Sequence, residues 1–409
     1  MAVCFLMVFT ALGFCSSNKS LYLGAITSAL HIPDGLFLIS DSCRYVATAV
    51  LNVFFGALIA KFGAKKLIAA GFAALIGFCV IYATAESVGV FYLGGICLGV
   101  GLAWTTTSMV GYAIGRWFPE NYGTVMGVVL ASNGLGTALS TQIVTPIIHD
   151  ETLGGFGYRR AYLLTAVILA VTAVIVLSFF REEPPNGLQV PIKKKKRGRA
   201  WSGVTLKQAA KKPYFYVALV AIFFTGASLQ SVSSVATKHL EVVGLDKSFI
   251  AAAFSLYALM LAAAKILSGL CFDRFGLRVT LIISYTIAVA GITMLSMVTA
   301  SSYTLATVYE LIIAYAMPLE TVMLPLIAAD LFGQKDSARI MGLFISVNTA
   351  GYAVGAPITG AAFDRLGTYK PVLLVLAGLM LTVAVVMQFV LTKAGKDRDA
   401  ICAREAAAE

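Results

Sequence analysis

Charged residues are scarce in this chain: Lys, Arg, Asp and Glu make up 12% of its 409 residues. A soluble domain carries about 25% of them, whereas 59% of the residues here are hydrophobic. This balance excludes an ordinary soluble enzyme with a large core. It indicates a protein that crosses a membrane many times.

Motifs for ATP binding and for metal binding are also lacking. The glycine-rich strings follow no predicted strand, so they are not nucleotide loops. The seven cysteines show neither metal-ligand spacing nor an extracellular pairing pattern. We therefore expect no cofactor, no metal and no enzymatic activity, and any energy for an uphill process must come from a gradient or from exchange.

Positive charge is plentiful but one-sided. The net charge is +11, and 22 of the 31 Lys and Arg residues fall in alternate loops and the C-terminal tail. The opposite loops hold six, and three lie in apolar spans: Lys19, Arg44 and Lys265. The positive-inside rule assigns the basic loops to the cytoplasm. The excess therefore needs no nucleic acid partner, and it predicts a plasma (inner) membrane protein with both termini cytoplasmic.

Apolar runs long enough to cross a hydrocarbon core of about 30 Å recur along the chain. They predict twelve helices, over residues 2–31, 35–62, 64–85, 89–116, 122–148, 160–180, 213–242, 248–272, 278–300, 303–330, 338–363 and 370–392. The first run is read as a retained helix rather than a signal peptide, since it has no basic n-region and no cleavage site. Because it starts almost at Met1, a misassigned start codon stays open.

A polar segment divides the twelve helices into six and six. Residues 181–212 contain Pro184, Pro185 and a cationic run at 193–199. We predict an N-terminal bundle over 1–180, a cytoplasmic basic linker over 181–212, a C-terminal bundle over 213–392 and a cytoplasmic tail over 393–409. The linker is read as solvated; contact with anionic headgroups is the alternative.

The two halves repeat each other. Gly56 opens "GALIAKFGAKK", and 213 positions later Gly269 opens "GLCFDRFGLRV". Asn133 opens "NGLG", and 215 positions later Asn348 opens "NTAG". A nearly constant offset indicates two parallel six-helix repeats, a pattern seen in secondary transporters.

Two lysines in apolar spans are the candidate binding residues. A charged side chain at mid-bilayer costs about 3 kcal/mol on insertion scales, so Lys19 and Lys265 are expected to face a cavity shared by the two halves. An ammonium is a point charge with three donors, which suits a carboxylate. One carboxylate between two lysines leaves a net positive charge, so either one lysine deprotonates or an acid compensates. Glu320 is the expected compensator and proton-coupling candidate, and a purely structural role is the alternative.

Other polar residues in the spans are read with two alternatives. Tyr22, Asn133 and Asn348 could line the cavity, or could serve in interhelical hydrogen bonds. Asp41 and Arg44, one turn apart, are read as an intrahelical pair or an outer gate element, and a role in binding is the alternative. His239 is expected at an exposed loop edge.

The turn after the eighth span resembles the signature loop of the major facilitator superfamily. The pattern is Gly269, Asp273, Arg274, Gly276 and Arg278. The first-half copy has Gly56, Gly63 and Lys65, with Ala60 where the acidic residue would be. We expect a conformational latch, in which the acid pairs with Arg and with helix-terminal amides. The resemblance implies the twelve-helix major facilitator fold.

A narrower resemblance covers nearly the whole chain. "RWFPENYGTVMG", "YRRAYLL", "GVTLKQAAKKPYFY" and "ADLFGQKDSARIMG" resemble the oxalate:formate antiporter and monocarboxylate transporter branch. That branch carries small carboxylates, and its helix-1 lysine and helix-8 cation match Lys19 and Lys265. The chain departs from it at Leu261, where the monocarboxylate pattern has Asp, and in the eleventh span, which has no Lys or Arg. These departures weaken the usual proton-coupling pair and disfavour a dianion.

The sequence therefore predicts a secondary transporter of a small organic monocarboxylate, working by alternating access as proton symport or anion exchange. Its partners would be the anion, a proton or counter-anion, and the lipid bilayer. Efflux of drugs or lipophilic compounds by the same fold is one rival reading, although two buried lysines disfavour it. A transporter-like sensor is the other.

Overall fold

The computed structural model describes residues 1–408 except 18, 33, 119–120, 149, 151–154, 183–202 and 334. Over these residues the chain is all-helical, with no strand. Nine of the described helices are long and apolar enough to cross a membrane, and a bent pair forms a tenth. With a broken first span and helix α7, they make up the twelve helices expected from the sequence.

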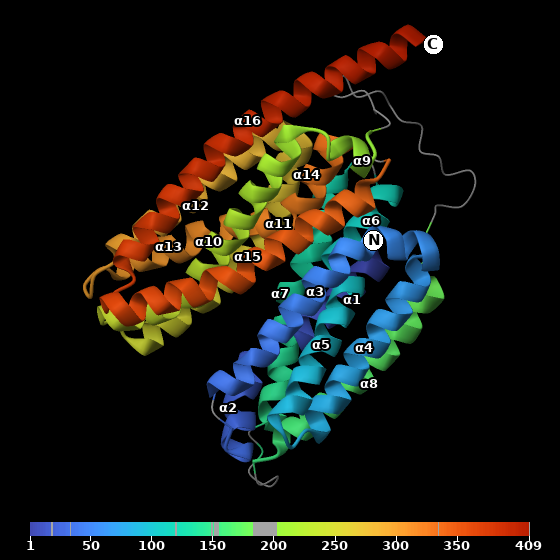
Figure 1. Cartoon of the computed structure of the whole chain (residues 1–409). Coiled ribbons are helices and arrows are strands. Elements are labelled where there is room, and N and C mark those ends of the chain that lie inside the picture. The colour runs from blue at the N-terminus through green and yellow to red at the C-terminus, as the bar shows by residue number, and fades with distance from the viewer. Residues whose placement is uncertain are drawn as a thin grey trace. The chain divides into compact units, whose positions relative to one another are not determined.

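The chain divides into two compact units, which are described separately (Figure 1). Unit 1 comprises Met1–Phe118 and Val128–Pro184. Its helices are α1 (Ala2–Cys15), α2 (Lys19–Leu30), α3 (Asp34–Phe62), α4 (Ala64–Thr84), α5 (Val88–Thr105), α6 (Thr107–Trp117), most of α7 (Tyr122–Ile148) and α8 (Gly157–Phe179).

Unit 2 comprises Pro119–Gly127 and Pro185–Glu409, so the first turns of α7 belong to it. Its other helices are α9 (Leu206–Ala209), α10 (Pro213–Val243), α11 (Lys247–Phe275), α12 (Leu277–Met297), α13 (Tyr303–Ala316), the 3-10 turn η2 (Met317–Glu320), α14 (Met323–Phe332), α15 (Ser337–Leu366) and α16 (Lys370–Ala408). Figure 1 shows α16 as the long helix beside α12.

Three of the expected spans are broken rather than continuous. The first ends as α1 at Cys15 and resumes as α2 at Lys19. The fourth is interrupted between Thr105 and Thr107, and the tenth bends by 45° between Glu320 and Met323. Thr106 and Glu320 are 214 positions apart, so the breaks in the fourth and tenth spans follow the repeat.

The expected linker and tail are only partly described. The cationic run at 193–199 lies outside the described residues. The short helix α9 is held by a hydrogen bond of 2.9 Å from the Leu206 amide to Asp336 Oδ2. Residues 393–408 continue α16 as helix, and Asp397 forms an ion pair of 2.7 Å with Lys212. The bounds of the two bundles stay a prediction.

Each unit buries aromatic side chains and exposes other apolar ones, both aliphatic and aromatic. In unit 1 the buried rings gather on α2, α3, α4, α5 and α8: Tyr22, Phe37, Phe78, Tyr82, Phe91 and Tyr162. Val174 on α8 and Val375 on α16 are 68% exposed. Side chains of this kind suit contact with acyl chains, which have no polar groups to bind.

His239 corrects one expectation. It was expected at an exposed loop edge, but it is 2% exposed. Its Nε2 lies 3.1 Å from the Leu295 carbonyl oxygen, and its ring packs edge-on against Tyr369. The side chain is buried because α12 and the turn before α16 cover the end of α10.

Helices α10 and α15 pack closely in unit 2. A Cβ at Gly351 would lie 2.3 Å from the carbonyl oxygen of Phe223, so the backbones nearly touch. Membrane helices have no hydrophobic force to draw them together, and they rely on small residues that permit such packing. Gly351 is therefore required for this pair to close.

We expect Gly351→Ala to lower the apparent melting temperature of the purified protein. The added methyl group must push α10 and α15 apart, and overpacking costs about 1–3 kcal/mol. Gly360→Ala on the same helix is the matched control, because a Cβ there would meet nothing within 4 Å. Equal melting temperatures for the two variants would contradict this account.

Candidate functional site

Polar side chains gather at the broken spans. A break leaves backbone groups without helical partners, and transporters use such discontinuous helices to build binding sites. One break in unit 1 follows α1, and there the Ser16 and Ser17 amides both donate to the Leu12 carbonyl oxygen. In unit 2 the break lies at η2, which ends at Glu320.

Two side chains from other helices contact the break after α1: Asn133, a predicted binding residue, and Arg44. The Ser17 hydroxyl donates to Asn133 Oδ1 on α7 over 3.0 Å. Arg44 on α3 donates from Nη1 to Ser16 Oγ over 2.7 Å. Lys19 is the first residue of α2, and its side chain lies outside what the structure describes. The break after α1 therefore brings Asn133 and Arg44 close to one another, and α2 begins just beyond it at Lys19.

Tyr22 lies one turn further along α2. It is 2% exposed, and its ring stacks on Tyr162 with centroids 4.1 Å apart. It belongs to the aromatic core of unit 1. Its role in substrate binding stays a prediction.

Lys265 lies on α11 in unit 2 and is 5% exposed. Its backbone is held firmly, because a Cβ at Gly127 on α7 would lie 2.3 Å from the Lys265 carbonyl oxygen. Ser268 also donates to that oxygen, over 3.0 Å. A buried ammonium on a fixed backbone has the properties expected of an anion-binding group.

Glu320 and Asn348 are joined through Tyr352. Asn348 on α15 is 1% exposed and donates from Nδ2 to the Tyr352 hydroxyl over 2.7 Å. Tyr352 in turn hydrogen-bonds to the Glu320 carboxylate at the bend of the tenth span. The sequence missed Tyr352, although its spacing of four residues from Asn348 puts both on one face of α15. The structure thus brings two of the predicted residues into one polar chain.

The signature loop forms the acid–amide contact expected of a latch. Asp273 accepts from the Gly123 amide (3.1 Å), the Thr124 amide (2.7 Å) and the Thr124 hydroxyl (2.5 Å). These are the first residues of α7, so the carboxylate caps that helix and complements its positive end. Gly123 and Gly269 let α7 and α11 touch, since a Cβ at Gly269 would lie 2.1 Å from the Gly123 oxygen.

The first-half copy has an acid from elsewhere in the chain. Glu182 Oε1 accepts from the Ala64 amide, and from the Lys65 amide over 3.1 Å, at the start of α4. Gly63 and Gly276 start α4 and α12 with φ of 78° and 82°, which favours glycine at both turns. Ala60 stands where the signature pattern has an acid, but Glu182 supplies a carboxylate to the start of α4 in the same unit.

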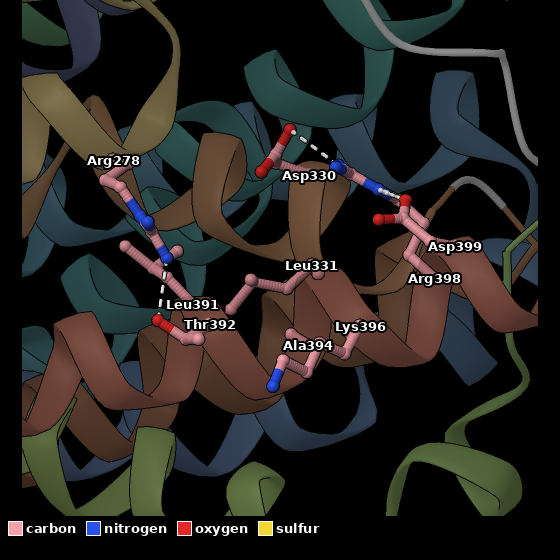
Figure 2. Close-up of a pocket in the computed structure, with 10 residues that line it drawn as sticks. Arg278, Asp330, Leu331, Leu391, Thr392, Ala394, Lys396, Arg398 and Asp399 are labelled. Carbon is pink, nitrogen blue, oxygen red and sulfur yellow. Dashed lines mark hydrogen bonds and ion pairs between the residues drawn. The ribbon is translucent and has the colours of Figure 1, made fainter.

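The remaining residues of the two signature copies lie on α3, α11 and α12. Gly56 is buried in α3, and the Arg274 guanidinium lies 5.5 Å from the Phe275 ring centroid. Arg278 donates from Nη2 to Thr392 Oγ1 over 2.7 Å. Beside this bond lies a cavity of about 290 Å³ between α12, α14 and α16 (Figure 2).

The cavity is lined by three basic side chains, Arg278, Lys396 and Arg398, and by two acidic ones, Asp330 and Asp399. Arg398 faces Asp330 at 3.9 Å and Asp399 at 3.8 Å (Figure 2). Arg398 thus already has carboxylate partners, and its contact with Asp330 joins α16 to the end of α14. Among the described residues no group of three His, Cys, Asp or Glu could hold a metal ion.

Comparison with protein families gives a match over most of the chain. Residues 3–251 and 220–401 match the model described as Major Facilitator Superfamily. Together the two matches cover residues 3–401.

Two curated relatives match parts of the chain. One is an "Uncharacterized MFS-type transporter YcxA" of Bacillus subtilis (strain 168), 22% identical over 227 residues, which are 54% of each protein. The other is the "Probable nitrate transporter NarT" of Staphylococcus carnosus (strain TM300), 26% identical over 167 residues, 41% of each. The chain thus spans about half the length, or less, of these relatives.

Solved structures share the fold over nearly the full length. The proton:xylose symporter XylE has a TM-score of 0.76 at 12% identity, covering 94% of both chains. The E. coli fucose:proton symporter FucP has a TM-score of 0.71 at 14% identity, covering 95% of this chain and 97% of its own. The human organic anion transporter MFSD10 has a TM-score of 0.66 at 12% identity, covering 94% and 98%. At these identities the likeness establishes the fold alone.

We expect Asp273→Ala to lower the apparent melting temperature, because three hydrogen bonds to the start of α7 are lost and a missing cap costs about 1 kcal/mol. Asp273→Asn, which keeps an acceptor oxygen, should lie between it and the native protein. Asp399→Ala is the control, since that carboxylate is 80% exposed. An Asp273→Ala variant that melts with the control would contradict the capping role.

Proposed function

The chain belongs to the Major Facilitator Superfamily, and from that premise we propose that it is a secondary active transporter of a small organic monocarboxylate, working by alternating access. The broken spans in both units support a transport function, since they expose polar groups within apolar helices. We further propose that it resides in the plasma (inner) membrane with both termini in the cytoplasm, because the positive charge lies in alternate loops.

Lys265 carries the proposal. A cation that is 5% exposed inside an apolar helix is expensive, and it is retained where it binds something. Its ammonium offers three donors and a full charge, which suit a carboxylate in surroundings of low dielectric constant. We propose that Lys265 holds the carboxylate and that Lys19, at the break after α1, is a second cationic ligand.

Glu320 is the proposed coupling residue. Its carboxylate hydrogen-bonds to Tyr352, which also accepts from Asn348. A change in the charge of Glu320 would therefore alter the hydrogen bonds of two residues on α15. A carboxylate at a helix break can exchange a proton or pair with a cation as the site fills and empties. This supports proton symport, while exchange with a second anion would need no change at Glu320.

Nitrate is the second candidate substrate, because one relative is named a probable nitrate transporter. Nitrate and a monocarboxylate are both planar and carry one negative charge, so the same cations would suit both. The absence of Lys and Arg between Arg339 and Arg365 disfavours a dianion.

We expect Lys265→Gln to abolish monocarboxylate uptake into proteoliposomes, because the amide is isosteric enough to pack but carries no charge. Lys393→Gln is the matched control: this lysine is exposed and lies over the Phe389 ring, away from the proposed site. Unchanged uptake by the Lys265→Gln protein would overturn the assignment.

A thermal-shift screen of the purified protein identifies the substrate class. We expect stabilisation by one or more of formate, lactate, pyruvate and nitrate, since a ligand that binds only the folded state raises the melting temperature. Oxalate should act weakly. Stabilisation by lipophilic cations but by no anion would contradict the proposal and favour efflux of apolar compounds.

A further inference from the structure

Arg44 is a buried guanidinium inside the third helix. It lies on α3, a helix of 29 residues, and it is 9% exposed. Charged residues within membrane helices are costly, usually face the protein interior, and mark the path of an ion or substrate. Neither the contacts of the signature loop nor the role proposed for Lys265 accounts for this second buried cation.

The backbone that carries Arg44 is fixed. A Cβ at Gly99 on α5 would lie 2.5 Å from the Arg44 carbonyl oxygen, and one at Gly95 would lie 2.3 Å from the Ser40 oxygen. The two helices therefore touch over a full turn at this point. A functional side chain on such a rigid contact is held in a constant position.

The guanidinium reaches the break in the first span. Its Nη1 donates to Ser16 Oγ over 2.7 Å, and its Cζ lies 4.4 Å from the Tyr45 ring centroid. The next residue, Ser17, bonds to Asn133 of α7. Helices α1, α3 and α7 thus present hydroxyl, guanidinium and amide groups at one interruption of the backbone.

Asp41 is the anionic partner of Arg44. Its Oδ1 lies 3.3 Å from Arg44 Nε, and its side chain is 26% exposed against 10% for the arginine. A guanidinium is a planar fork that matches a planar oxyanion in two parallel hydrogen bonds. A substrate carboxylate is the same chemical group as the Asp41 carboxylate, so the two would compete for one fork.

We propose that Arg44 binds a small planar oxyanion, and that Asp41 is an internal competitor which pairs with the guanidinium when no anion is bound. The proposal rests on the proposed function in one respect, namely that the protein transports an anion of this class. Asp41 keeps the buried cation neutralised in the empty protein, and its greater exposure lets it turn away when the anion arrives.

The test measures apparent affinity for formate, pyruvate and nitrate on the purified full-length protein, from the concentration dependence of its melting temperature. We expect Asp41→Asn to tighten binding by roughly 3- to 10-fold, the factor for losing a competing ion pair of intermediate exposure. Arg44→Gln should weaken binding at least about tenfold, and Arg44→Lys should fall between, since it keeps the charge but loses the fork.

Lys61→Gln is the matched control, because Lys61 is exposed at the far end of the same helix and lies over the Phe62 ring. It should leave the affinity unchanged. If Arg44→Gln does not fold, Asp41→Asn decides alone: an ion pair that is only structural would lower the melting temperature when broken and would not tighten anion binding. Unchanged or weaker binding by Asp41→Asn overturns the proposal.

The outcomes separate this proposal from the function proposed above. If only nitrate binds, and both substitutions act on it as expected, Arg44 is an anion ligand while the monocarboxylate assignment fails. If carboxylates bind the native and Arg44→Gln proteins equally, the monocarboxylate function stands and the role of Arg44 is overturned. Absence of binding by all three anions overturns both.

Discussion

Polar groups inside the hydrocarbon must find their partners within the protein, because acyl chains offer none. The three broken spans show how this constraint shapes the molecule. At the break of the fourth span, the Thr105 and Thr106 hydroxyls turn back to the Gly101 and Leu102 carbonyl oxygens, over 2.8 Å and 2.6 Å. At the other two breaks the partners come from different helices. Ser17 binds Asn133 of α7, and Tyr352 of α15 binds Glu320.

The same constraint explains which features the sequence could predict. Spans follow from apolar length alone, and the twelve helices were read correctly. The acid–amide contact of Asp273 followed from the signature pattern, since an acid beside a helix start has a general electrostatic reason to bind there. The turns at Gly63 and Gly276 also followed, because both copies of the repeat place a glycine at the start of a helix.

Contacts between distant residues could not be read from the sequence. Glu182 caps α4 from 117 or 118 positions away, and nothing in "REEPP" distinguishes it from a linker acid. The hydrogen bond from Arg44 to Ser16 depends on the first span ending at Cys15, which hydropathy alone did not reveal. His239 was misjudged because its burial depends on Leu295 and Tyr369, neither of which is near it in sequence. The break at Glu320 did carry a local signal, since Pro318 removes a helical donor.

The two buried cations, Arg44 and Lys265, lie on helices that the repeat relates to each other. The offset of 213 relates α3 to α11, so Arg44 and Lys265 lie on equivalent helices, one in each unit. They are not at equivalent positions: the counterpart of Lys265 is Asn52, and that of Arg44 is Tyr257. Each cation nevertheless has its own carbonyl oxygen pressed against a glycine of a neighbouring helix, Gly99 in one case and Gly127 in the other.

In both units a backbone contact with a glycine holds the helix that carries the cation, and this contact does not depend on the charge. The contact fixes the backbone of Arg44 and of Lys265, and it requires only that the facing residue be small. The cation sits at a different height in each half: Arg44 lies eight residues, about two helical turns, before Asn52, the counterpart of Lys265. The repeated scaffold thus carries a different donor in each unit: the planar fork of Arg44 on α3 and the point charge of Lys265 on α11.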